Sequence, residues 1–280
     1  MCAERGVGPN SMRASAASLA VAAVVALAVA ASGSASPPKP FPRFAEPNCS
    51  RADFTSAGTR IRAELCRATS DAKAGRAVVV LHGCGGFSTL DHRITATLPA
   101  DGIATLYVDY FGPTPPPGTK GFCGGRGAGL TAFTGFRDVF ARWQQVVEDA
   151  GSALRGTPRI DPHRVGLVGW SLGGGLAVAT AAAADSGRSA ATRPFAAVVG
   201  FSTGSGRGGR APTSLPPLLL LSGGVHDAIP LADTRALYDA ARAAGVHAEL
   251  FVYPNGSHDW PGRQGTVGIS RAARFLRAVL

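Results

Sequence analysis

Three polar side chains in the second half of the chain could together carry nucleophilic catalysis: Ser171, Asp227 and His258. A serine hydroxyl becomes a good nucleophile when an imidazole accepts its proton. A carboxylate hydrogen-bonded to that imidazole fixes its tautomer and stabilises its charged form. Each of the three follows a segment with the composition of a buried strand. We therefore predict that Ser171 is the nucleophile, that His258 is the base and then the acid, and that Asp227 orients His258.

The predicted nucleophile lies in the pentapeptide GWSLG (169–173), between an apolar run at 165–169 and an Ala-rich stretch at 172–185. A strand followed at once by a helix requires a sharp turn. The flanking glycines relieve the crowding there, and the serine side chain projects beyond the sheet edge. The pentapeptide occurs often by chance, so its strand-to-helix placement is what makes it informative. Trp170 either lines an acyl or aromatic subsite or packs behind the turn, and the sequence favours neither.

A second glycine-rich motif, HGCGG (82–86), directly follows the β-branched run at 77–81. Glycines in such a loop let the backbone approach a ligand closely and leave amides available. We predict that the backbone N–H groups of Cys84 and Leu172 hold the oxyanion of a tetrahedral intermediate. A plain glycine-rich turn is the alternative, and it would be preferred if Ser171 did not follow downstream.

The predicted acid and base also lie after apolar runs. Asp227 follows the run at 217–221, and His258 lies in the loop after the last run, at 247–253. Asp227 could instead cap a helix, but Asp233 fills that role better ahead of the next helix. A lone histidine is more often structural than catalytic, and only His258 comes after both the serine and the aspartate. The remaining histidines are His82, His92, His163, His226 and His247.

Strand-like and helix-like segments alternate along the chain, which predicts an α/β protein with a mostly parallel sheet and helices on both faces. Strands are expected at 59–68, 77–81, 103–107, 165–169, 195–199, 217–221 and 247–253, and helices at 89–101, 131–154, 172–185, 231–244 and 266–280. The Gly/Pro-rich segments at 112–129 and 203–214 are expected to be loops, the first of them bordering the active site. Neither is a dinucleotide site, because the glycine cluster does not follow a strand.

The N-terminus carries the features of a secretory signal peptide, predicted at 1–35. Two arginines precede an uncharged Ala/Val/Leu-rich stretch at 14–31, and small residues follow it. An uncleaved membrane anchor is the alternative, although the stretch is short and only weakly apolar. A Pro-rich linker at 36–50 and a single domain at 51–280 are expected to follow. The mature protein is thus expected to be secreted or periplasmic, without stable membrane insertion.

Export makes disulfides the favoured reading of the cysteines that remain after cleavage: Cys49, Cys66, Cys84 and Cys123. We expect Cys49–Cys66, which would staple the N-terminal segment to an early strand, and Cys84–Cys123. Zinc is the alternative, but no C-x-x-C or close His/Cys cluster supports it. We therefore expect no metal site.

Composition limits the classes of protein to consider. The 280 residues are 45% hydrophobic and 16% charged, which suits one sizeable core and argues against disorder. There are 28 Lys+Arg against 18 Asp+Glu, a formal net charge of +10. The arginines are scattered and no basic run reaches five residues, so the charge is interpreted as solvated surface and no nucleic-acid partner is expected.

The motifs and their order resemble the dienelactone hydrolase family of the α/β-hydrolase fold, over roughly residues 55–280. The segment DHRITATLPADGIATLYVDYFG (91–112) is similar to the helix–strand unit after the oxyanion loop in that family. The resemblance implies a mostly parallel central sheet flanked by helices. No large lid is expected, because the sequence has no large insertion between the predicted strands. The resemblance also implies the hydrolysis of esters.

Several positions depart from the family's founding enzymes. Those enzymes use a cysteine nucleophile, where this chain has Ser171, and a glutamate where it has Gly83. They also clamp a substrate carboxylate with two arginines, which would fall near Pro113 and Gly262; Arg263 is one place off. The resemblance therefore supports serine chemistry on an ester other than dienelactone, with Trp170 and Arg263 as candidate pocket residues.

The expected function is a secreted serine hydrolase that cleaves carboxylic esters through an acyl-enzyme. It would need no metal or organic cofactor, would act as a monomer, and would take a small-molecule or a polymeric ester. Two alternatives remain open: a peptidase of the same fold, and a catalytically silent binding protein on this scaffold.

Overall fold

The computed structural model describes residues 41, 44–112, 136–185, 194–204 and 214–280. The predicted signal peptide, Cys123 and the loop expected at 112–129 (apart from its first residue) lie outside this described part. The described residues belong to one compact unit, Pro38–Leu280.

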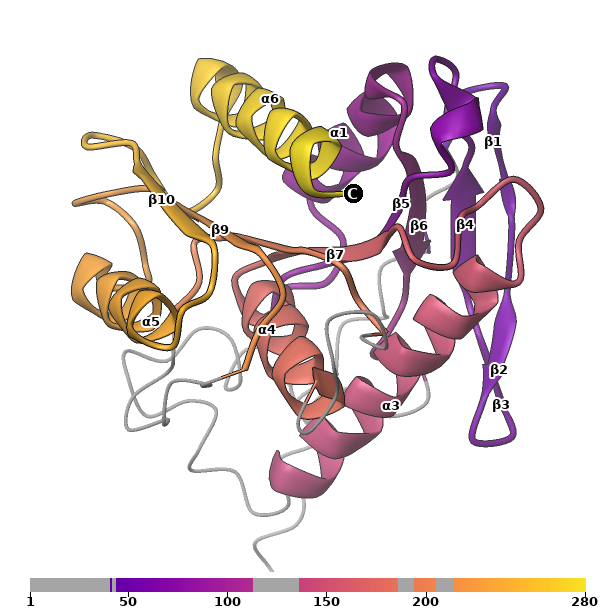
Figure 1. The fold of residues 1–280 in the computed structure, drawn as a ribbon, viewed down its shortest axis with the longest axis horizontal. Helices are drawn as coiled ribbons and strands as arrows, with labels where there is room; N and C mark the ends of the chain where they lie inside the picture. Colours follow the sequence, from indigo (N-terminus) through magenta and orange to yellow (C-terminus); the bar gives the residue numbers. More distant parts are fainter. Residues whose placement is uncertain (1–40, 42–43, 113–135, 186–193, 205–213) are drawn as a thin grey trace, which may run out of the picture. The chain divides into compact units, whose positions relative to one another are not determined.

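An eight-stranded sheet forms the centre of the described part, in the order β1-β4-β6-β5-β7-β8-β9-β10 (Figure 1). Its strands are β1 (Cys49–Arg51), β4 (Ala63–Cys66), β5 (Ala77–Leu81), β6 (Ala104–Val108), β7 (Val165–Trp170), β8 (Val198–Phe201), β9 (Leu218–Ser222) and β10 (Ala248–Val252). The strands from β6 to β10 in this order pair in parallel, whereas β4 and β1 pair antiparallel at one edge. The predicted mostly parallel sheet is therefore confirmed.

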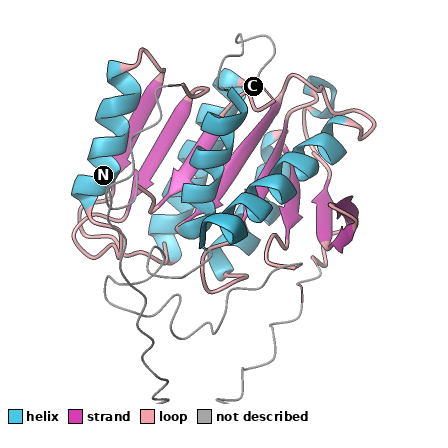
Figure 2. Ribbon diagram, turned by 90° about the horizontal axis from the view of Figure 1, so that it is seen from below, coloured by secondary structure: helices cyan, strands magenta, loops and turns pink. Residues whose placement is uncertain are grey.

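Helices cover both faces of the sheet (Figures 1 and 2). One face packs against α1 (Thr89–Thr97) and α6 (Gly262–Val279), and the other against α3 (Phe136–Arg155), α4 (Leu172–Asp185) and α5 (Leu231–Ala243). Two short 3-10 helices, η2 (Ala72–Ala74) and η3 (Leu98–Asp101), also lie in the described ranges. The middle strands are buried along their whole length, as their β-branched and leucine-rich sequences require when both faces are covered. No helix in these described ranges has the length and apolar character needed to cross a bilayer.

The strand expected at 59–68 is divided in the structure. β3 (Thr59–Ile61) pairs with β2 (Phe54–Ser56) in a separate ribbon, and β4 joins the main sheet. The chain changes partners at Arg62, whose carbonyl accepts from the Asp109 amide while its guanidinium pairs with the Asp109 carboxylate. Alternation of polar and apolar residues continues through this point, so the sequence pattern gave no sign of the break.

Part of the segment expected as a linker packs on the domain. Phe41 and Phe44 are buried, and both rings contact Tyr107. Aromatic side chains bury a large apolar area when they are placed against a core, which outweighs the proline-rich composition around them. The folded unit thus begins earlier than the sequence suggested.

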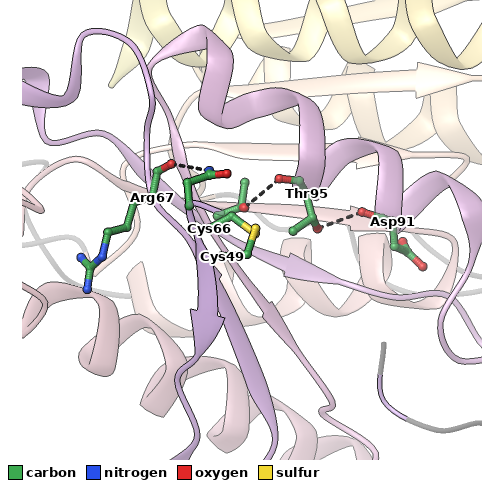
Figure 3. Close-up of a disulfide and its surroundings, with 7 residues drawn as sticks. Cys49, Cys66, Arg67, Asp91 and Thr95 are labelled. Atoms are coloured by element: carbon green, nitrogen blue, oxygen red, sulfur yellow. Dashed lines mark hydrogen bonds between the residues drawn. A yellow bond between two sulfur atoms is a disulfide. The ribbon is translucent and has the colours of Figure 1, made fainter. Parts of the chain in front are cut away.

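A disulfide ties the edge strand of the sheet to its neighbour. Cys49 and Cys66 are bonded and lie directly opposite each other in the β1–β4 register (Figure 3). Just beyond it, the Asn48 side chain donates to the Arg67 carbonyl at 2.7 Å. The first predicted pair is therefore confirmed. Cys84 is also disulfide-bonded, but Cys123, its predicted partner, lies outside the described residues.

Candidate active site

The turn between β7 and α4 holds Ser171 in a conformation that non-glycine residues rarely adopt, with φ of 54°. Its amide donates to the Phe201 carbonyl at 2.9 Å, which ties the turn to β8. A Cβ atom on Gly169 would overlap the carbonyl of Gly173, and a Cβ on Gly173 would overlap that of His82. The two glycines of the pentapeptide are thus required by close backbone approach.

The structure brings the three predicted residues together. His258 Nε2 lies 3.0 Å from Ser171 Oγ, and His258 Nδ1 lies 2.7 Å from Asp227 Oδ1. They meet because β7, β9 and β10 run parallel, so the loops after them leave the sheet at the same edge. Bridges between Gly224 and Asn255 and between His226 and Ser257 hold the aspartate and histidine loops side by side.

The Asp227 carboxylate is enclosed, with none of its side-chain surface exposed. Its Oδ1 also accepts from the Ile229 amide at 3.1 Å, and its Oδ2 accepts from the Gly223 amide at 2.7 Å and the Ser202 hydroxyl at 2.5 Å. Burial alone raises the pKa of Asp227, but the hydrogen bonds from His258, Ser202 and the two amides bring that pKa below its usual value. The group is therefore a carboxylate at neutral pH, able to stabilise an imidazolium.

The expected capping role of Asp233 is not observed. Helix α5 has Pro230 at its N-cap, and Asp233 lies within the first turn. A carboxylate there still interacts favourably with the helix N-terminus, but it makes no side-chain cap.

Sequence reasoning missed two residues next to Asp227. Ser202 follows β8, and its buried hydroxyl donates to the carboxylate; Trp260 donates its indole N–H to Ser202 Oγ at 2.8 Å. A serine after an apolar strand is ordinary, and its meeting with Trp260 depends on tertiary structure. The only available signal was that Trp260 lies two residues after His258.

Of the two roles that the sequence left open for Trp170, the structure shows packing behind the turn, and a place in a substrate subsite stays a prediction. Its indole N–H donates to the carbonyl of His258 at 2.9 Å, and a Cβ on Gly83 would lie 2.5 Å from its ring. The ring therefore packs behind the site, against the glycine-rich loop. The same side chain also lines a cavity, described below.

The glycine-rich loop at 82–86 folds as a tight turn. The Gly86 amide donates to the Gly83 carbonyl at 3.0 Å, and Gly86 has φ of 78°. Leu172 is the first residue of α4, where amides lack acceptors within the helix. The first turn of α4 packs against the end of β5, which brings Leu172 to the same edge of the sheet as Cys84. Their pairing as an oxyanion site stays a prediction.

His82 supports this loop from inside the core. Its Nδ1–H donates to the Gly83 carbonyl at 2.8 Å, and its ring stacks on Tyr110 with centroids 4.1 Å apart. Burial lowers the pKa of His82 to about 4, so the ring is neutral at physiological pH. The Tyr110 hydroxyl donates to the His82 carbonyl at 2.9 Å. The histidine is thus a structural residue of the loop.

A cavity of about 420 Å³, which we call the Trp170 cavity, is lined in part by the chain neighbours of Ser171 and His258. It is lined by Gly85, Gly86, Phe87, Ser88, Thr89, Leu90, Trp170 and Asp259. Asp259 is exposed, and no lysine, arginine or histidine contributes to this lining in the described part of the chain. Arg263, predicted as a pocket residue, instead lies exposed in the first turn of α6 and does not line the cavity. The turn buries the following residue, Gln264, and so directs Arg263 outward. Among the described residues, no three His, Cys, Asp or Glu side chains are grouped for metal binding.

Solved structures with the same fold include esterases. The chain is similar to P91, a dienelactone hydrolase-like promiscuous phosphotriesterase from metagenomic libraries, with 18% identity, a TM-score of 0.62, and coverage of 82% of this chain and 98% of that one. It is similar to an esterase of Pyrobaculum calidifontis, with 20% identity, a TM-score of 0.59, and coverage of 83% and 86%. It is also similar to esterase 2 of Thermogutta terrifontis, with 17% identity, a TM-score of 0.59, and coverage of 83% and 95%.

Comparison with the curated proteins gives no match. The model of the dienelactone hydrolase family matches residues 63–274, which is most of the chain and agrees with the resemblance noted in its motifs. The chain therefore belongs to the dienelactone hydrolase family.

Proposed function

We propose that this protein is an exported serine esterase in which Ser171, His258 and Asp227 cleave carboxylic esters through an acyl-enzyme. The observation that carries the proposal is the pair of contacts made by His258, 3.0 Å to Ser171 Oγ and 2.7 Å to Asp227 Oδ1. Family membership and the esterases among its fold neighbours support hydrolysis of ester bonds.

In the first half of the reaction, Ser171 Oγ attacks the ester carbonyl while His258 Nε2 accepts its proton. Asp227 holds the ring in the tautomer with the proton on Nδ1 and stabilises the imidazolium that forms. The amides of Cys84 and Leu172 donate to the oxyanion. When the carbon–oxygen bond to the alcohol breaks, His258 returns the proton to the leaving oxygen. The acyl group stays on Ser171.

In the second half, water attacks the acyl-enzyme and His258 accepts a proton from it. The second tetrahedral intermediate collapses, the carboxylic acid leaves, and Ser171 Oγ regains its proton from His258. The reaction consumes one water and releases one alcohol and one acid. It needs no group beyond these residues.

The Trp170 cavity supports a substrate whose bound portion is uncharged or cationic. Its lining combines the aromatic rings of Trp170 and Phe87 with the exposed carboxylate of Asp259. Aromatic faces attract cations, and a carboxylate repels a substrate carboxylate. This differs from the arginine clamp of the founding enzymes. Both a small ester and the chain end of a polymeric ester have suitable chemistry.

The proposal is tested with p-nitrophenyl acetate and the Ser171→Ala variant. Loss of the nucleophile should lower kcat by several orders of magnitude and leave only a low remaining activity. Ser56→Ala is the matched control, because Ser56 is a buried serine whose hydroxyl has no hydrogen-bond partner among the described residues. Equal turnover by wild type and Ser171→Ala would reject the serine mechanism.

The same preparation separates the alternatives. A peptidase would cleave peptide amides and leave simple esters intact, and a binding protein would bind esters without turnover. Reaction with a fluorophosphonate, which traps an activated serine, should modify Ser171 stoichiometrically in the esterase and leave Ser171 unmodified in a silent scaffold.

Export and a monomeric state belong to the same proposal. The signal-like sequence at 1–35 and the Cys49–Cys66 disulfide support an oxidising compartment. N-terminal sequencing of the protein recovered outside the cytoplasm should begin after Ala35. A protein that retains residues 1–35 would indicate an anchor instead. Size-exclusion chromatography with light scattering should give the mass of one chain.

A further inference from the structure

We propose that Ser202 and Trp260 form a positioning pair that aims Asp227 at His258. In this arrangement the Trp260 indole donates to Ser202, and the Ser202 hydroxyl donates to one oxygen of Asp227 while the other oxygen faces His258. The inference rests on the proposed function, because it assumes that Asp227 orients the catalytic base.

The direction of each hydrogen bond follows from the donors available. An indole N–H can only donate, so Ser202 Oγ accepts from Trp260 at 2.8 Å. The single proton of the serine hydroxyl then remains for an acceptor. Asp227 Oδ2 lies at 2.5 Å and the His258 carbonyl at 3.5 Å, so the carboxylate receives it. Trp260 thereby prevents the hydroxyl from turning toward any other partner.

The pair is held rigidly by the fold. Ser202 and Trp260 are both fully buried, and both have left-handed backbone angles, with φ of 47° and 50°. The Ser202 amide donates to the Leu221 carbonyl at 2.7 Å, and the Trp260 ring packs edge-on against Phe201 at 5.2 Å. Non-glycine residues keep such angles only where the surrounding structure demands them, and they cluster at functional sites. Here two of them meet at one hydrogen bond.

The consequence for Asp227 is both geometric and electrostatic. Each carboxylate oxygen has two donors, so rotation of the group would break several hydrogen bonds at once. Donation from Ser202 also spreads the negative charge, which weakens the hold of the carboxylate on a proton and on the imidazolium. Among the described residues, His258 is the titratable side chain that contacts Asp227. A substitution at Ser202 should therefore change the pH at which the Asp227–His258 pair is protonated.

The experiment compares five variants on a neutral p-nitrophenyl ester across pH: Ser202→Ala, Ser202→Gly, Trp260→Phe, the double variant Ser202→Ala/Trp260→Phe, and Ser56→Ala as the control. Loss of a hydrogen bond to a charged group should lower kcat by about 10- to 100-fold. KM should stay unchanged, since neither Ser202 nor Trp260 lines the Trp170 cavity. The acid limb of the kcat/KM profile should move to higher pH, because a carboxylate with fewer donors stabilises the imidazolium more.

Ser202→Gly separates the hydroxyl from the backbone. It removes the hydroxyl while relieving the left-handed conformation, so it should move the acid limb as far as Ser202→Ala does. The double variant should lose no more activity than the more damaged single variant, because both substitutions break one chain of hydrogen bonds. Ser56→Ala should match wild type in kcat, KM and pH profile.

Two results would overturn the positioning role in folded, Ser171-dependent enzyme. One is an unchanged acid limb in either Ser202 variant. The other is a fold-decrease in kcat of the double variant that equals the product of the fold-decreases in the two single variants. Failure of the proposed function has a different signature, since turnover would then survive the loss of Ser171. Circular dichroism of each variant shows whether it has folded, and the pH profile is read only on folded protein.

Discussion

Trp170 joins the two halves of the candidate site: its ring packs over Gly83, and its indole N–H donates to the His258 carbonyl. A Cβ at Gly83 would lie 2.5 Å from the ring, closer than van der Waals contact allows. The position where the founding enzymes carry a glutamate is thus filled here by an aromatic ring. Any side chain at position 83 would collide with the Trp170 ring where it now lies, so this ring position requires a glycine there.

Gly83→Ala should therefore impair catalysis without touching any reacting group. The added methyl must displace Trp170, which weakens its hydrogen bond to the loop of the base and shifts the amides of the glycine-rich loop. We expect kcat/KM for p-nitrophenyl acetate to fall by about tenfold or more, as for loss of a well-aligned hydrogen bond of about 1.4 kcal/mol. Gly156→Ala, where a Cβ would make only ordinary contacts, is the control. Unchanged kinetics in Gly83→Ala would contradict this coupling.

The buried side chains of His82 and Asp91 should make the free energy of unfolding depend on pH in opposite directions. Burial lowers the pKa of His82 to about 4, so between pH 4 and 6.5 the unfolded chain binds a proton that the folded protein does not, and stability rises with pH. Burial raises the pKa of Asp91 to about 7, against the hydrogen bonds from Ser88 and Tyr107. Between pH 3.8 and 7 the folded protein keeps a proton that the unfolded chain has released, so stability falls.

Asp91→Asn should remove the contribution of Asp91 to this pH dependence and leave that of His82. Each contribution is on the order of 3 to 4 kcal/mol, so they largely offset each other in the wild type between pH 4 and 6.5. In Asp91→Asn the His82 contribution remains, and the free energy of unfolding should rise more steeply with pH than in wild type. Urea titrations at several pH values measure this, with the exposed Asp239→Asn as the control. Parallel pH curves for wild type and Asp91→Asn would show that Asp91 is ionised in the fold.

The Cys49–Cys66 disulfide should contribute to stability and not to catalysis. It closes a loop with a sequence separation of 17 residues at the β1 edge, away from the strands that carry the triad. For a loop of this length, chain entropy gives about 3 kcal/mol. The double variant Cys49→Ala/Cys66→Ala should unfold at a lower urea concentration and keep its kcat. An unchanged unfolding midpoint would mean that the β1–β4 pairing suffices without the covalent bond.

Asp259 should set the charge preference of the Trp170 cavity. We compare p-nitrophenyl esters of butyrate, succinate and 4-(trimethylammonio)butyrate, which share a leaving group and carry a neutral, anionic or cationic acyl chain. Asp259→Asn should raise kcat/KM for the anionic ester and lower it for the cationic ester by about 1.5- to 5-fold, the size of an exposed charge interaction. The neutral ester should be unaffected. The differences should shrink in high salt, and identical profiles in wild type and variant would assign charge selection elsewhere.

The sheet, and the meeting of Ser171, Asp227 and His258, could be predicted because both follow from local patterns. Buried parallel strands have an apolar sequence of their own, and residues that follow such strands must meet at one edge. The division of the first predicted strand at Arg62 could not be predicted, since the chain changes partners without a change in polarity. The burial of Phe41 and Phe44 likewise depends on a distant partner, Tyr107.

At the candidate site, the sequence identified the three side chains that meet and missed the residues that contact them. Trp260 donates to Ser202 and Ser202 donates to Asp227, and these hydrogen bonds join three separate loops in a way that no spacing along the chain encodes. Arg263 is a candidate because it lies one place from the position of a family arginine, but the first turn of α6 directs it into solvent. Asp233 suits a capping position by residue type, yet α5 begins at Leu231 and leaves it inside the first turn.

The left-handed backbone conformation of Ser171, the proposed nucleophile, implies that the serine makes the fold less stable than a glycine at this position would. Glycine accepts that conformation freely, so Ser171→Gly should melt at a higher temperature than wild type while it is inactive. Heat resistance and turnover therefore pull this position in opposite directions. Selection for thermostability alone would therefore favour inactive variants at this position. Each round of such a selection needs an activity assay alongside the measurement of thermal stability.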